Sequence, residues 1–97
     1  MTEIEFRNLC FEAVKSYFKK HNDTTNDIKE ITDNQIFIVW QVKALQNFKA
    51  LASTTLPDGM YYEITYNGDK DELYFDAYKK WENICFTGIH AVDPEKQ

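Results

Sequence analysis

Four side chains in the sequence are of types that ligate zinc, namely Cys10, His21, Cys85 and His90. Zinc sites usually contain closely spaced ligand pairs, as in C-x₂-C, because a short loop holds both ligands in place. No such pair occurs here. We therefore interpret the cysteines as small buried hydrophobic residues and the histidines as solvent-facing, and we predict no metal and no other cofactor.

A cysteine and a histidine could also perform nucleophilic catalysis, which requires a thiol with a lowered pKa. Cys10 falls on the apolar face of a predicted helix and Cys85 in an apolar, aromatic run, and burial in such surroundings raises a thiol's pKa. The chain has no G-x-S-x-G, P-loop or dinucleotide-binding pattern, and only three glycines. The sequence therefore predicts no catalytic residue and a protein that is not an enzyme.

Acidic side chains form two further candidate groups. Glu63 and Asp76 could face each other across a hairpin, where paired carboxylates can act as general acid and base, although solvated surface carboxylates are commoner. Asp69, Asp71 and Glu72 resemble part of a calcium loop, but the twelve-residue ligand spacing is missing. We interpret them as the solvated tip of a hairpin.

Length and composition indicate one folded domain over residues 1–97. The chain is 43% hydrophobic and 15% aromatic, which is incompatible with disorder. Its net charge of −5 disfavours duplex DNA, whose phosphates require a basic surface, and suits a protein or small-molecule partner. Without a leader, a membrane-spanning run or a disulfide framework, we expect a protein of the reducing cytoplasm.

Residues 2–21 have the spacing of an amphipathic helix. Thr2 and Glu5 have capping-box spacing, and acidic residues begin the helix while lysines end it. The predicted apolar face consists of Phe6, Leu9, Cys10, Ala13, Val14, Tyr17 and Phe18. Residues 21–27 are predicted to form a loop, and residues 28–31 a short strand or turn.

The first clear strand is predicted over residues 35–44, where β-branched and aromatic residues are dense. Strict alternation assigns one face to Ile36, Ile38, Trp40 and Val42, and the other to Phe37, Val39, Gln41 and Lys43. Residues 45–47 would be a tight connection to a second strand over residues 48–54. A helix over residues 42–52 is the alternative, because Ala, Leu, Gln and Lys favour it.

Two further strands are predicted on either side of Asn67-Gly68, the best hairpin signal in the chain. Residues 60–66 alternate, with Met60, Tyr62, Ile64 and Tyr66 on one face. The returning strand runs from about residue 72 to 79, residues 80–86 fit strand or helix, and a flexible tail begins at about residue 87. The predicted fold is α+β, an N-terminal amphipathic helix packed on a three- or four-stranded antiparallel meander, with a C-terminal segment that is strand or helix.

Three blocks of sequence resemble a family of small uncharacterised proteins of phages and prophages of low-GC Gram-positive bacteria. They begin with Trp40-Gln-Val-Lys43, Asp58-Gly59-Met60 and Asp76-Ala-Tyr78, and the resemblance covers roughly residues 6–86. It implies a phage-encoded protein that acts in the cytoplasm of the infected cell, and it assigns no activity, cofactor or catalytic residue.

Aromatic and basic residues are in excess on the predicted sheet, and one helix can cover only one face of it. Some of the aromatic side chains must therefore lie on the second face. Such a face is typical of a subunit or partner interface, or of a platform that stacks single-stranded bases, unless the C-terminal segment folds back over it. We expect a non-enzymatic protein-binding or self-associating module, with single-stranded nucleic-acid binding as the alternative; the candidate interaction surface is Tyr61, Tyr74, Tyr78, Trp40, Lys43 and Lys49.

Overall fold

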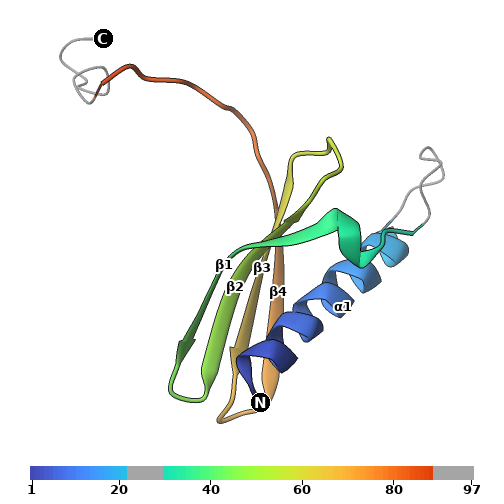
Figure 1. Cartoon of the computed structure of the whole chain (residues 1–97), viewed down its shortest axis with the longest axis vertical. Helices are drawn as coiled ribbons and strands as arrows, with labels where there is room; N and C mark the ends of the chain where they lie inside the picture. Colours follow the sequence, from blue (N-terminus) through green and yellow to red (C-terminus); the bar gives the residue numbers. More distant parts are fainter. Residues whose placement is uncertain (22–29, 89–97) are drawn as a thin grey trace.

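The computed structural model describes residues 1–21 and 30–88, which form one helix on one antiparallel sheet (Figure 1). The helix α1 spans Glu3–His21 and a short 3-10 helix, η1, spans Asp33–Gln35. The strands are β1 (Ile36–Ala44), β2 (Asn47–Thr54), β3 (Met60–Asn67) and β4 (Glu72–Lys79), and they lie in the order β1-β2-β3-β4. The predicted α+β class, with an N-terminal helix on an antiparallel meander, is confirmed.

The helix begins with the predicted capping box. The backbone N–H of Glu5 donates to Thr2 Oγ1 over 3.1 Å, and the backbone N–H of Thr2 donates to Glu5 Oε1 over 2.8 Å. These two bonds satisfy backbone donors that have no partner within the helix. They fix the first turn of α1, and the apolar stripe of the helix begins directly after this turn, at Phe6.

The apolar stripe of α1 packs on the face of the sheet formed by alternate residues of β2 and β3. Phe6, Cys10 and Val14 are fully buried, and the ring of Phe6 stacks on Phe48 with centroids 5.0 Å apart. Phe11, which the predicted stripe omitted, is also buried. It belongs to the same buried cluster as Ile31 and Ile36, which precede and begin β1.

A β-bulge in β1 makes the predicted alternation of this strand wrong beyond Ile38. Ile38 pairs with Ala52, but Trp40 pairs with Leu51, so Val39 is an extra residue without a partner in β2. Because neighbouring residues of β2 point to opposite faces, Ile38 and Trp40 do so as well. Beyond the bulge, Gln41 faces the helix, where its amide donates to the Glu3 carbonyl over 2.9 Å.

The turns at one end of the sheet hold each other in place. Leu45 lies in the β1–β2 turn with a φ of 58°, and the alternative of a helix over residues 42–52 is wrong. The Gly68 N–H donates to Asn47 Oδ1 over 2.9 Å, and the Gln46 amide donates to Asp69. A side chain at Gly68 would collide with the backbone of Gln46, so this glycine permits the close approach of the two hairpins.

The predicted strand from residue 72 to 79 is confirmed as β4, but residues 80–86 are neither strand nor helix. They leave the end of β4 and run away from the sheet (Figure 1). Residues 22–27 of the predicted loop, residues 28 and 29 of the predicted element at residues 28–31 and most of the predicted tail lie outside the described residues, and residues 30 and 31 are neither strand nor helix.

Candidate interaction surface on the open sheet face

The sheet face opposite α1, called the open face below, carries exposed apolar side chains. The register places on it Phe37, Trp40, Val42, Lys49, Leu51, Ser53, Tyr61, Glu63, Thr65, Tyr74, Asp76 and Tyr78. Trp40, Tyr74 and Tyr78 are 42%, 52% and 52% exposed, and Phe37 and Val42 are exposed to a similar degree. Five large apolar or aromatic side chains on one flat face are therefore in contact with solvent.

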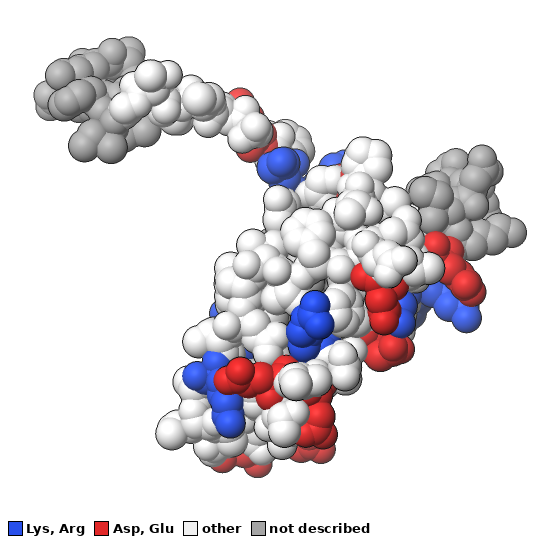
Figure 2. Space-filling model, viewed as in Figure 1, with Lys and Arg blue, Asp and Glu red and all other residues white. Residues whose placement is uncertain are grey.

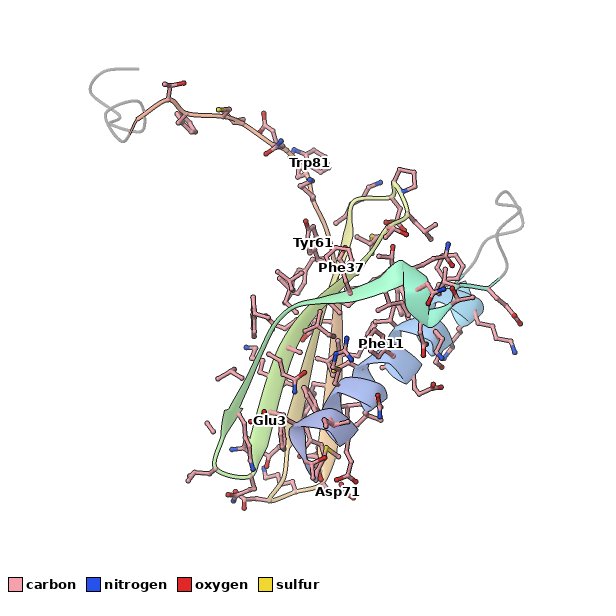
Figure 3. All side chains as sticks on the ribbon, viewed as in Figure 1. Glu3, Phe11, Phe37, Tyr61, Asp71 and Trp81 are labelled. Carbon is pink, nitrogen blue, oxygen red and sulfur yellow. The ribbon has the colours of Figure 1, made fainter. Side chains whose placement is uncertain are left out.

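One row of this face is predominantly aromatic. Phe37 pairs with Ser53, Ser53 with Tyr61, and Tyr61 with Tyr78, from β1 through to β4. Ser53 is only 6% exposed, and its hydroxyl donates to the Met60 carbonyl over 2.7 Å. The rings of Phe37 and Tyr61 flank this small residue at the end of the sheet from which the C-terminal segment departs (Figure 3).

The charged side chains of the open face are mostly acidic. Lys49 Nζ lies 3.4 Å from Glu63 Oε1, and Glu63 pairs directly with Asp76 across the β3–β4 hairpin. The predicted juxtaposition of these two carboxylates is therefore confirmed. Lys49 neutralises Glu63, and both carboxylates lie on a solvent-exposed face of the sheet. The arrangement is therefore a surface ion pair, Lys49–Glu63, beside the solvated carboxylate of Asp76.

Of the six residues predicted for the interaction surface, five lie on the open face and Lys43 does not. Lys43 pairs with Phe48 and its ammonium group lies 5.4 Å from the centre of that ring, on the helix side of the sheet. The bulge at Val39 is the reason, because it reverses the face of every later residue of β1. For the same reason the sequence interpretation placed Trp40 and Val42 on the same face as Ile38.

The tyrosines with shifted pKa values lie on the helix side. Burial, followed by the charges of Asp58 and Tyr17, raises the pKa of Tyr62 to about 12. The hydroxyl of Tyr66 donates to Asp71 Oδ1 over 2.7 Å, and this bond raises the pKa of Tyr66. Burial in the core thus favours the protonated form of Tyr62, and the hydrogen bond to Asp71 at the hairpin end favours that of Tyr66.

Of the four side chains considered as zinc ligands, the structure describes three, and it does not bring them together. Cys10 is buried in the core, where burial raises the pKa of its thiol to about 12. His21 is exposed at the end of α1. Cys85 is exposed on the segment after β4, which corrects the prediction of a second buried cysteine, and His90 lies outside the described residues.

No group of three His, Cys, Asp or Glu side chains able to hold a metal converges within residues 1–21 and 30–88. Two hollows of about 350 and 410 Å³ lie away from the open face. One is beside α1, between Glu12, Lys15 and Ile31, and the other is at the hairpin ends, between Met1, Lys43 and Gly68. Neither contains a cluster that suggests a reaction.

Over the side of the molecule that carries α1, acidic and basic side chains are mixed, and basic side chains form no continuous area in this view (Figure 2). The described part of the chain also contains no helix with the length and apolar character needed to cross a bilayer. The exposed apolar residues of the open face are therefore the feature that most needs an explanation.

Comparison with known proteins gives one match. The model of DUF6275, a family of unknown function, matches residues 7–88, which include α1, all four strands and the segment after β4. No curated protein and no solved structure matches the chain.

Proposed function

We propose that this chain, which belongs to the DUF6275 family of unknown function, is a self-associating module. In this proposal the open face is the contact between two copies. The observation that carries this proposal is the set of exposed aromatic and aliphatic side chains on that face, among them Trp40, Tyr74 and Tyr78. Tyr and Trp are the residues that most often anchor protein interfaces.

The size of the open face supports this role. Four strands about 4.8 Å apart, each of about eight residues that rise about 3.3 Å, give a face of roughly 500 Å². Two such faces together bury roughly 1,000 Å², which is the lower limit for a stable biological interface. Two sheets that pack face to face form a sandwich with a core about 10 Å thick, and this covers the apolar side of each sheet.

The charge of the open face favours a second copy over a nucleic acid. Its acidic residues include Glu63 and Asp76, whereas its lysine, Lys49, is already paired with Glu63. A strand of phosphates would therefore meet a face without a free lysine among the described side chains that the register places there. Single-stranded nucleic-acid binding requires basic residues along the bound strand, and the open face does not present them.

The resemblance to small phage and prophage proteins extends the proposal to a biological setting. On that resemblance, the self-associating module is a non-enzymatic accessory protein that acts in the cytoplasm of an infected bacterium.

The test is a measurement of mass by sedimentation or light scattering over a range of protein concentrations. We expect a dimer for the wild type and an association weakened about tenfold or more by Trp40→Ala or Tyr78→Ala. Ile4→Ala is the matched control, because Ile4 is a large apolar residue, 72% exposed, on the helix and away from the open face. A wild type that stays monomeric at all concentrations contradicts the proposal.

Salt distinguishes the two functions. Two copies that each carry a net charge of −5 repel one another, so salt should strengthen self-association by screening, with a Debye length of about 8 Å at physiological ionic strength. Nucleic-acid binding is weakened by salt. Tryptophan quenching by an oligonucleotide that salt reverses would favour the alternative function.

A further inference from the structure

The segment after β4 begins at a fixed point and then leaves the fold. The Lys80 N–H donates to the Gly59 carbonyl over 2.7 Å, in the β2–β3 connection. Beyond Lys80, the described residues make no backbone hydrogen bond to the rest of the described chain. Trp81, which follows directly, already lies away from the sheet (Figure 3).

This segment, residues 81–86, carries large apolar side chains that its own fold leaves in solvent. Trp81 is 93% exposed, Ile84 58% and Phe86 46%, and the thiol of Cys85 is exposed as well. Figure 2 shows the described part of this segment as mostly uncharged beyond its first residues. Within residues 1–21 and 30–88, two apolar surfaces are therefore uncovered, the open face and the segment that starts at the end of the sheet.

We propose that residues 81–86 of one copy lie against the open face of a second copy. This inference rests on the proposed self-association and specifies what covers the open face in the assembly. The occupant is a named segment of the same chain, and its apolar side chains match the exposed apolar side chains of the open face, among them Trp40, Val42 and Tyr74.

The arrangement of the side chains favours a second copy over the segment's own sheet. Successive side chains of an extended segment point to opposite sides. In an extended conformation Trp81 and Cys85 would lie on one side of the segment, and Ile84 and Phe86 on the other. A segment that folded back on its own sheet would cover only one side, whereas a segment between the open faces of two copies has both sides covered.

The connection to β4 also favours exchange between copies. No glycine or proline occurs between Lys79 and Gly88, and Asn83 is the single residue of this stretch that tight turns favour, so a reversal directly after β4 has little support from the sequence. Lys80 is held to Gly59 at the end of the sheet. From this point the segment continues outward, beyond the end of the sheet (Figure 1).

The length of the segment matches the surface that it would cover. Six extended residues span about 20 Å, and the outer strands of a four-stranded sheet are about 14 Å apart. A segment from each copy that lies between the two open faces is buried on both sides, so its own surface adds to the area of the two faces and brings the contact towards the standard interface size of about 1,600 Å².

The test uses two full-length chains that can be told apart by size. One carries Cys85→Ser together with Val42→Cys or Thr65→Cys, which puts a thiol on the open face, and the other is the wild type with Cys85. Cys10 does not compete, because it is buried and burial raises the pKa of its thiol to about 12. The chains are mixed and oxidised with copper phenanthroline, and the disulfide products are separated by mass.

We expect a mixed disulfide between position 42 or 65 of one chain and Cys85 of the other. It should form at least about tenfold faster than with the control chain Lys19→Cys/Cys85→Ser, because docking raises the effective concentration of the two thiols. We also expect Trp81→Ser to weaken association about tenfold in the wild-type background without changing the circular dichroism spectrum.

Three results would overturn the inference, and they separate it from the proposed function. If a chain that retains Cys85 and carries Thr65→Cys forms only an intrachain disulfide, the segment covers its own sheet. If dimers form but no mixed disulfide appears at either position and Trp81→Ser has no effect, the open faces associate without the segment. A protein that stays monomeric contradicts both proposals.

Discussion

Ile38 and Trp40 lie on opposite faces of β1, although they are two residues apart. Ile38 packs against the core under α1, whereas Trp40 is 42% exposed on the open face. The extra residue between them, Val39, has no partner in β2. This single bulge determines which side chains of β1 contribute to the open face.

Removal of Val39 should leave both faces of the sheet intact. The pairs on either side of the bulge keep their partners in β2, so we expect the free energy of unfolding to change by no more than about 1 kcal/mol. Deletion of Leu51 from the central strand β2 is the contrasting variant, because it forces residues on one side of the deletion onto the wrong face. Urea unfolding followed by circular dichroism measures both, and equal losses in the two variants would contradict the assigned register.

Glu5 should make the stability of the protein depend on pH. Its pKa is lowered, chiefly because the backbone N–H of Thr2 donates to the carboxylate. A lowered folded-state pKa means that the stabilisation is present above the unfolded pKa, near 4.3, and is lost as the pH falls through the folded value. Glu5→Gln retains an acceptor but not the charge. Urea midpoints measured from pH 7 to pH 3 should therefore fall less steeply for Glu5→Gln, and two parallel curves would be the contrary result.

A side chain at Gly68 should separate the two hairpins. In Gly68→Ala the new Cβ would lie within contact distance of the Gln46 carbonyl oxygen, and the hydrogen bond from Gly68 N–H to Asn47 would be disturbed. We expect a loss of about 1–3 kcal/mol in the free energy of unfolding. Asn47→Ala is the control, because it removes the hydrogen bond to the Gly68 N–H without placing an atom against Gln46. Similar losses for both variants would show that the contact with Gln46 is unimportant.

The two thiols should differ in reactivity. Cys85 is exposed, whereas Cys10 is buried and the pKa of its thiol is raised to about 12 by burial. Because the thiolate is the reactive form, we expect dilute native protein to react with one equivalent of a thiol reagent and denatured protein with two. Rapid reaction of native Cys85→Ser would be incompatible with the buried position of Cys10.

Elements that one consistent pattern specifies could be predicted from the sequence. The helical spacing and the pair Thr2–Glu5 predicted α1 and its capping box, and the alternation of residues 60–66 predicted which side chains of β3 share a face. The Asn67-Gly68 pair correctly located the last hairpin, although neither residue has a positive φ and the left-handed residue of its loop is Asp71. At these places local preference and tertiary packing agree.

The interaction surface was only partly predictable, because β1 is apolar on both sides around the bulge. Residues 36–40 are all hydrophobic, so alternation alone cannot identify the extra residue, and the faces of Trp40 and Lys43 depend on pairing with β2. Residues 80–86 combine strand and helix preferences, beyond Lys80 they have no backbone partner in the described part of the fold, and the structure gives them neither state. Burial of Cys85 was predicted from its apolar neighbours, which are themselves exposed.

The order of the strands has a consequence for synthesis of the protein. The helix α1 is made first, but its buried residues such as Phe6 pack on Phe48 and on the residues of β3, which leave the ribosome much later. Each strand pairs with the one made just before it, so the sheet can grow hairpin by hairpin as the chain emerges. The central strands β2 and β3, which form most of the surface for α1, are therefore paired before the edge strand β4 is complete.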